Sequence, residues 1–186
     1  ARGPLAHGTA VPPMGRMARP LAITGTERRL LSVVLLGPVM ENAEAAAEVA
    51  VEALRRAIKP YGGRLEQLAD GSTIVVLEAD SQVATDQAAQ AARCALALRA
   101  YAKGRPMTIA MGRTESALKP PEGDVIDRAS RLLAHMPTVS EDNPPIALDE
   151  VSAGLLDARF DVVEREAGLL LYGERALMQG ARTLLG

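Results

Sequence analysis

An uninterrupted apolar stretch constrains this fold more than any other feature of the chain. Residues 30–36 read Leu-Leu-Ser-Val-Val-Leu-Leu, with Ser32 as the one polar residue, and Pro38 follows shortly after. A run of this kind is too short for a helix and is typical of a strand that is buried on both faces of a sheet. The sequence therefore predicts a central strand that ends before Pro38.

The rest of the chain alternates between helical and strand patterns. Residues 41–58 begin with acidic side chains and end with basic ones, an order that complements the dipole of a helix. Asp70-Gly71 separates two short strand patterns and is a favoured tight hairpin turn. We expect further helices from about residue 81 to 102, from residue 124 onward and from 149 to 156, and further strands at residues 64–68, 73–77, 107–111, 146–148, 160–163 and 169–172.

These elements follow the order β-α-β-β-α-β-α-β-α-β-β. A hairpin directly after the first helix makes the sheet mixed and mostly antiparallel, and we expect the helices to pack on one side of it. The second helix carries a stripe of mostly small residues, which predicts close contact with the sheet: Ala88, Ala91, Ala95, Leu98 and Ala102. The pattern as a whole predicts an α+β fold.

Composition and charge narrow the classes of function. The chain has 186 residues, a formal net charge of −2 and 48% hydrophobic residues, which suits one globular domain. A near-neutral net charge gives no sign of the basic surface that nucleic-acid binding needs. Aromatic residues make up 2% of the chain, so few rings are present on which bases would stack. No apolar stretch approaches membrane-spanning length. We therefore expect no nucleic-acid partner and no membrane association.

A single cysteine, Cys94, lies in an alanine-rich helical stretch. One cysteine cannot form a disulfide within the chain, so a reducing compartment and a cytoplasmic location are expected. We interpret Cys94 as a small buried apolar residue.

Three segments carry motifs that resemble those of the class III nucleotide cyclase domain, the adenylyl/guanylyl cyclase homology fold. They are residues 32–38 (SVVLLGP), 65–71 (LEQLADG) and 123–132 (GDVIDRASRL). The resemblance extends over residues 28–172, and we place the domain at residues 28–173. It implies a ferredoxin-like core with extensions, in agreement with the order of elements above.

The resemblance implies a metal site that has lost a ligand. In the family, two aspartates on neighbouring strands hold a pair of divalent metal ions. The first position is Gly37 here and offers no side chain, whereas Asp70 matches the second. Asp70 also has a structural explanation, because Asp-Gly is a favoured hairpin turn in any fold. We therefore expect no metal to bind, and we interpret Asp70 as a vestige of the site.

The positions that read the nucleotide have changed as well. The adenine-reading lysine of the family falls on Glu66, the ribose-orienting asparagine on Asp127, and the phosphate-binding arginine on Arg131. Asp127 precedes Arg131 by one helical turn, so we favour an ion pair between them over phosphate binding. The stretch from Gly112 to Gly123 is shorter than the family's equivalent, whose hairpin carries a further adenine contact and part of the dimer surface. We expect no catalytic residue among these vestiges.

Both ends of the chain resemble junctions in large bacterial signalling proteins. Residues 26–34 are similar to the start of cyclase-like modules that follow an N-terminal Ser/Thr protein kinase, and residues 173–186 are similar to the join before a C-terminal ATPase of the STAND type. Residues 1–27 are rich in glycine, proline and alanine, so we expect a flexible linker there. We expect a second linker at residues 174–186, and the flanking domains of the same polypeptide as partners.

These changes predict a catalytically degenerate domain, a pseudoenzyme that acts as a regulatory or dimerising module, because a fold can outlast its chemistry. We expect no cofactor and a weak homodimer at most. Two alternatives stay open. One is an active cyclase with unusual handling of Mg²⁺ or Mn²⁺, and the other is a ligand-sensing module that binds a nucleotide or another small molecule without turnover.

Overall fold

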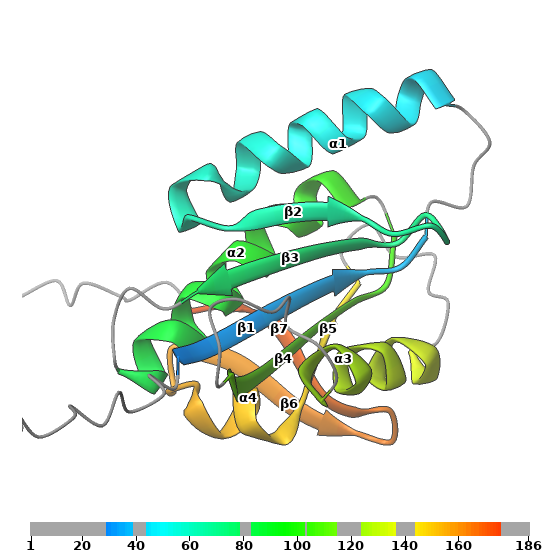
Figure 1. Ribbon diagram of the computed structural model, residues 1–186. Coiled ribbons are helices and arrows are strands. Elements are labelled where there is room, and N and C mark those ends of the chain that lie inside the picture. The colour runs from blue at the N-terminus through cyan, green and yellow to red at the C-terminus, as the bar shows by residue number, and fades with distance from the viewer. Residues whose placement is uncertain are drawn as a thin grey trace, which may run out of the picture.

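In the computed structural model, which describes residues 29–38, 44–78, 83–102, 104–114, 124–136 and 144–175, seven strands form one sheet with four α-helices packed against it (Figure 1). The strands are β1 (Arg29–Leu36), β2 (Arg64–Gln67), β3 (Thr73–Glu78), β4 (Met107–Thr114), β5 (Ile146–Leu148), β6 (Phe160–Arg165) and β7 (Gly168–Glu174). The helices are α1 (Glu44–Ile58), α2 (Ala84–Ala102), α3 (Asp124–His135) and α4 (Glu150–Leu155), with a short 3₁₀ helix η1 (Lys59–Tyr61) after α1.

This order of elements is the one that the sequence predicts. The predicted linkers at residues 1–27 and 174–186 lie outside the described residues, apart from residues 174 and 175. Among the helices that the structure describes, none is both long and apolar enough to span a membrane.

The sheet has the strand order β2-β3-β1-β4-β5-β7-β6. β1 lies at its centre and pairs antiparallel with β3 on one side and with β4 on the other. The pair of β4 and β5 is parallel, while β2–β3, β5–β7 and β6–β7 are antiparallel. Every side chain from Leu31 to Leu36 is buried. The predicted central strand and the predicted mostly antiparallel α+β sheet are therefore confirmed.

Apolar side chains cover both faces of β1, because successive residues of a strand point to opposite sides. Val34 and Leu36 cluster with residues of α1 and α2, whereas Val33 and Leu35 cluster with Val125 of α3. α3 therefore lies on the face opposite α2, in front of the sheet in Figure 1. The expectation that the helices pack on one side holds for α1, α2 and α4 but not for α3, since a strand that is apolar at consecutive positions needs cover on both faces.

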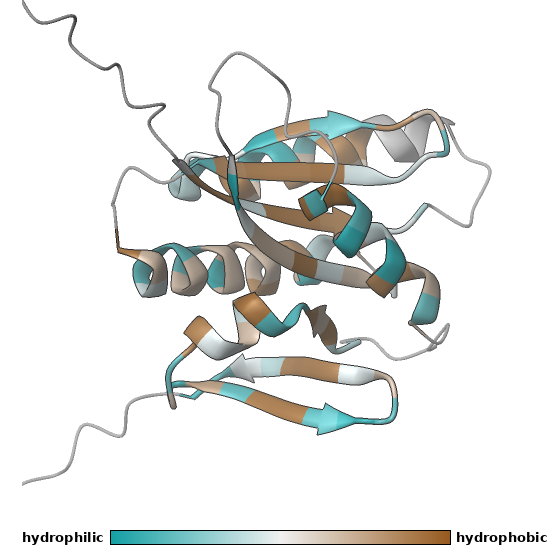
Figure 2. Cartoon of the chain, turned by 60° about the horizontal axis from the view of Figure 1, so that its bottom comes forward, coloured by the Kyte–Doolittle hydropathy of each residue, from teal (hydrophilic) through white to brown (hydrophobic). Residues whose placement is uncertain are grey.

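α2 packs closely on the sheet through small side chains. The whole predicted stripe is buried, and Ala91, Ala95 and Leu98 are fully enclosed. Cys94 lies beside them, and burial raises the pKa of its thiol to about 12, so that it stays protonated as the predicted core residue. Figure 2 shows hydrophobic colour along the central strands, which α2 and α3 cover from opposite sides.

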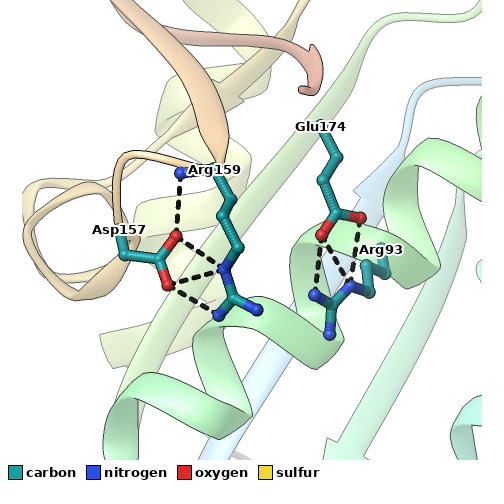
Figure 3. A network of polar contacts seen from close by, with 4 residues as sticks. All are labelled: Arg93, Asp157, Arg159 and Glu174. Atoms are coloured by element: carbon teal, nitrogen blue, oxygen red, sulfur yellow. Dashed lines mark hydrogen bonds and ion pairs between the residues drawn. The ribbon is translucent and has the colours of Figure 1, made fainter. Parts of the chain in front are cut away.

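Arg93 and Glu174 join the last strand to α2, and Asp157 and Arg159 form a second pair near them, before β6 (Figure 3). Arg93 of α2 donates from Nε and Nη2 to the carboxylate of Glu174 at 2.6–3.1 Å, and its guanidinium lies 5.7 Å from the centre of the Phe160 ring. Arg159 pairs with Asp157, with Nη2 at 2.6 Å from Oδ2. The hydrogen bond from Arg93 holds the pKa of Glu174 below its ordinary value. A partly exposed pair such as Arg93 and Glu174 contributes at most about 1 kcal/mol, so its main effect is to align β7 with α2.

Candidate functional site

The position that matches the first metal-binding aspartate is enclosed by backbone and proline atoms. Gly37 directly follows β1, its N–H donates to the carbonyl of Pro106 at 2.9 Å, and the residue is buried. A Cβ atom added to Gly37 would lie 2.8 Å from Cγ and 3.1 Å from Cδ of Pro106. Cβ atoms do not approach other carbon atoms to 2.8 Å, so an aspartate fits here only if Pro106 moves.

The second position lies at the tip of the hairpin between β2 and β3. Asp70 Oδ1 accepts a hydrogen bond from the main-chain N–H of Ser72 at 2.9 Å, and Oδ2 accepts one from Ser72 Oγ at 3.0 Å. Gly71 has a φ of +82°, a left-handed conformation that glycine adopts without strain. These bonds, first the one from the Ser72 backbone and then the one from its hydroxyl, lower the pKa of Asp70. The carboxylate therefore closes its own turn, as the hairpin interpretation of Asp70 predicts.

The lowered pKa of Asp70 gives this turn a pH dependence. The ordinary pKa is 3.8 and the folded value is lower, so the ionised carboxylate stabilises the fold above that range, and its contribution is lost as the pH falls through the folded pKa. We expect Asp70→Ala to lower the free energy of unfolding at pH ~7 and to have a smaller effect near pH ~2. Urea titrations of both proteins at the two pH values measure the difference. An equal loss at both would show that the ionised form does not close the turn.

The fold brings these two positions to the same end of the sheet. Leu36 at the end of β1 pairs with Thr73 at the start of β3. Gly37, which follows β1, therefore lies near the hairpin residues that precede β3. A Cβ atom on Gly71 would lie 3.7 Å from Cβ of Pro38. The two positions that the resemblance assigns to metal binding therefore border one region.

A buried arginine that no sequence motif marks also lies in this region. Arg105 is 9% exposed and precedes β4 by two residues. Its Nε donates to the main-chain carbonyl of Gly37 at 2.6 Å, and its Nη2 donates to Thr73 Oγ1 at 3.0 Å. Burial lowers the pKa of Arg105, yet a guanidinium keeps its proton in proteins. No sequence signal reveals this residue, because its burial follows from the pairing of β1 with β3 and β4.

The other predicted site residues are exposed. Glu66 lies on the edge strand β2, where its Oε1 pairs with Nε of Arg64 at 3.2 Å. On α3, Arg131 Nε donates to the main-chain carbonyl of Asp127 at 3.2 Å. The predicted ion pair between Asp127 and Arg131 is wrong, because an exposed ion pair gains little and the arginine bonds the carbonyl one helical turn earlier. Within the described residues, no hydrogen bond or ion pair joins Glu66 to either residue of α3.

The inner face of α3 carries a further arginine that the motif comparison does not reveal. Arg128 donates from Nη2 to the main-chain carbonyl of Met111, and its Nε lies 3.3 Å from Oδ2 of Asp149 without the geometry of a hydrogen bond. Asp149 is 6% exposed and caps α4 by accepting from the N–H of Ser152 at 2.8 Å. An acidic residue directly before a helix is the one sequence signal for this contact. The ion pair joins α3 to α4 and β4.

Close packing also holds α3 on β4. A Cβ atom on Gly112 would lie 2.5 Å from Cγ2 of Val125, so a larger residue does not fit between helix and strand unless one of them moves. Thr108 Oγ1 donates to the main-chain carbonyl of Ala129 at 3.1 Å. The motif helix therefore uses its inner face for attachment to the sheet. The remainder of the shortened stretch, residues 115–123, lies outside the described residues.

Solved structures that this fold resembles include nucleotide cyclase domains. The adenylyl cyclase CyaB from P. aeruginosa matches with a TM-score of 0.57 over 81% of this chain and 97% of that chain, at 15% sequence identity. The monomeric guanylyl cyclase domain of the RhoGC fusion protein from the aquatic fungus Blastocladiella emersonii matches with a TM-score of 0.59 over 80% of this chain and 97% of that chain, at 12% identity. This chain has the fold of a class III cyclase domain. No protein-family model matches the sequence, and no curated protein matches it either.

A cyclase site at this end of the sheet needs ligands for two metal ions, and the residues present do not fit them. Gly37 has no side chain, both oxygens of Asp70 accept from Ser72, and the guanidinium of Arg105 lies against the same region. Mg²⁺ and Mn²⁺ take several oxygen ligands at defined positions. Within the residues that the structure describes, no three His, Cys, Asp or Glu side chains gather in an arrangement that would hold a metal ion.

Proposed function

We propose that this cyclase-like domain is catalytically degenerate and acts as a regulatory or dimerisation module of a larger signalling protein. The observation that carries the proposal is the enclosure of Gly37 by Pro106 and Arg105, at the position where cyclases of this family hold their metal ions. Two-metal catalysis places the charge of the ions at the reacting phosphate. The carboxylate is missing at Gly37, and a guanidinium bonds the main-chain carbonyl of the same residue, so the described residues of this site offer little to hold that charge in place.

The exposed charges at the nucleotide-reading positions support the same proposal. Glu66 and Asp127 are acidic where the family carries lysine and asparagine, and like charges repel a triphosphate. Arg131 is the retained phosphate-binding position, and its Nε bonds the helix on which it stands. For the metal ions, the base and the ribose alike, the positions with which the family binds them therefore include a residue that is unsuited to that role.

The proposal extends to the surroundings of the domain. From the resemblance at residues 26–34 and 173–186 we propose that the domain lies between a Ser/Thr kinase and a STAND ATPase in a bacterial, cytoplasmic protein, with these flanking domains as its partners. RhoGC, whose cyclase domain has a similar fold, is a fusion protein, and crystal structures show its domain as a monomer and as a non-canonical dimer. We propose a weak homodimer for this chain too, strengthened by the raised effective concentration within a larger protein.

The first consequence is an absence of turnover. We expect the purified chain to form no cyclic AMP or cyclic GMP from ATP or GTP in the presence of Mn²⁺, because the carboxylate at the first metal position is missing. Mass spectrometry of the products measures this, with an active cyclase domain assayed in parallel as the positive control. If cyclic product forms and Asp70→Ala abolishes it, the proposal is wrong, because that result shows a working metal site.

Calorimetry separates this proposal from the ligand-sensing alternative. Titration with ATP, GTP and the cyclic nucleotides, with and without Mn²⁺, is expected to give no binding heat. Binding without turnover would assign a ligand-sensing function to the domain and leave its catalytic degeneracy in place.

A further inference from the structure

Arg105, two residues before β4, bonds groups at the end of β1 and at the start of β3. Its main-chain N–H bonds the carbonyl of Ala102 at 3.0 Å, which closes the turn that leads from α2 toward β4. Its guanidinium bonds the carbonyl of Gly37, directly after β1, and the hydroxyl of Thr73, at the start of β3. The side chain is thus positioned by contacts on both strands that neighbour the site.

Among the residues that the structure describes, no carboxylate pairs with this charge. Within the described residues Arg105 forms no ion pair, and its side-chain acceptors are a carbonyl and a hydroxyl oxygen. Asp70, the acidic residue of the site, has both oxygens bonded to Ser72. Because a guanidinium stays protonated even when buried, this end of the sheet carries a permanent positive charge.

We infer that Arg105 is a built-in cation that excludes divalent metal ions from this site. Its guanidinium bonds the main-chain carbonyl of Gly37, which is the first metal position. It also bonds the hydroxyl of Thr73, the first residue of β3, which follows the second metal position at Asp70. Charges of the same sign repel strongly where burial reduces screening. This inference rests on the proposed function in one respect: both take Gly37 and Asp70 to be the positions at which related cyclases bind metal ions.

Two barriers, one steric and one electrostatic, therefore separate this site from a metal-binding one. Pro106 leaves no room for a Cβ atom at Gly37, and the Arg105 guanidinium bonds the main-chain carbonyl of the same residue. An opposite charge within about 4–6 Å stabilises the ionised form of a carboxylate without any metal. Restoring the lost aspartate alone is therefore expected to create an ion pair and no metal site.

The test uses the full chain and four variants. Pro106→Ala removes the steric barrier and serves as the reference, and Gly37→Asp/Pro106→Ala adds the carboxylate. The same double variant is then combined with Arg105→Met, which removes the charge, or with Arg105→Lys, which keeps it. The readouts are Mn²⁺ binding by electron paramagnetic resonance and the change in melting temperature in millimolar Mn²⁺. Neither depends on cyclic nucleotide production, so failure of this inference is distinguishable from failure of the proposed function.

The variant with Arg105→Met is expected to bind Mn²⁺ about tenfold more tightly than the double variant and the variant with Arg105→Lys, because it alone combines the carboxylate with a neutral residue at position 105. Equal affinities of the methionine and lysine variants would overturn the inference. If the methionine variant does not fold, the double variant decides the matter. Mn²⁺ binding there that is tighter than in the Pro106→Ala reference contradicts the exclusion of metal by Arg105, and binding no tighter than in the reference supports it.

Discussion

Asp149→Ala is expected to lower the free energy of unfolding by about 2–4 kcal/mol, because it removes a buried carboxylate to which two main-chain N–H groups donate. The Asp149 side chain is 6% exposed and accepts from the N–H groups of Ser152 and Met111. It also pairs with Arg128 at 3.3 Å. Alanine leaves both N–H groups without an acceptor, which is costly where they are buried. It also removes the counter-ion of the Arg128 guanidinium, a smaller effect because that side chain is partly exposed. Urea unfolding at neutral pH measures the loss.

Matched variants separate the causes of this effect. Asp149→Asn keeps an oxygen for the α4 cap and removes the charge, so we expect an intermediate loss. Asp157→Ala removes an aspartate that is half exposed and paired with Arg159, and should destabilise far less because solvent screens that pair. Arg128→Met and the double variant complete a thermodynamic cycle for the coupling energy. A loss below about 1 kcal/mol for Asp149→Ala would contradict the role of this ion pair in holding α3 and α4 on the sheet.

Leu98→Ala is expected to cost about 2–5 kcal/mol of stability through the cavity that it leaves. Leu98 is fully buried on the face of α2 that contacts the sheet, in a cluster with Leu54 of α1 and Met107 of β4. Its neighbours in the stripe are alanines, which are too short to fill the space. Thermal and urea unfolding report the loss.

Leu96→Ala is the matched control for this prediction. Leu96 lies on the same helix and is partly buried, so less apolar surface returns to water when it is shortened and a smaller loss is expected. Equal losses for the two variants would show that the stripe predicted from the sequence is not the tightly packed face of α2.

The features that could be predicted from the sequence depend on local pattern. The apolar run at residues 30–36 predicts the central strand, since few other structures accommodate consecutive apolar residues over so short a length. The spacing of alanines along α2 predicts its buried face, because that spacing follows the turn of the helix. Asp70-Gly71 predicts the hairpin, because the turn needs a left-handed residue that glycine supplies. In each case the residues that decide the structure are close together in sequence.

The features that could not be predicted depend on contacts between distant segments. A charged residue is expected at the surface, and the burial of Arg105 follows only once Gly37 and Thr73 are brought together by the sheet. The same holds for the contact of Arg128 with Asp149. The position of α3 on the second face of the sheet is also set by tertiary packing. The sequence of α3 shows that one face of the helix is apolar, but it does not show which face of the sheet that side packs against. The motif comparison identified Gly37, and the structure adds the proline that encloses it.

The central place of β1 has a consequence for how the chain reaches its folded state. Both partners of β1 come later in the sequence, with Leu31 opposite Glu78 in β3 and Gly112 in β4. During synthesis this mostly apolar strand leaves the ribosome before both of its partners and stays unpaired until they follow, and such long-range pairing slows folding. An unpaired apolar strand is a template for association with other chains. The segment that builds the core of the finished domain is therefore also the segment from which aggregation is expected to start when folding is delayed.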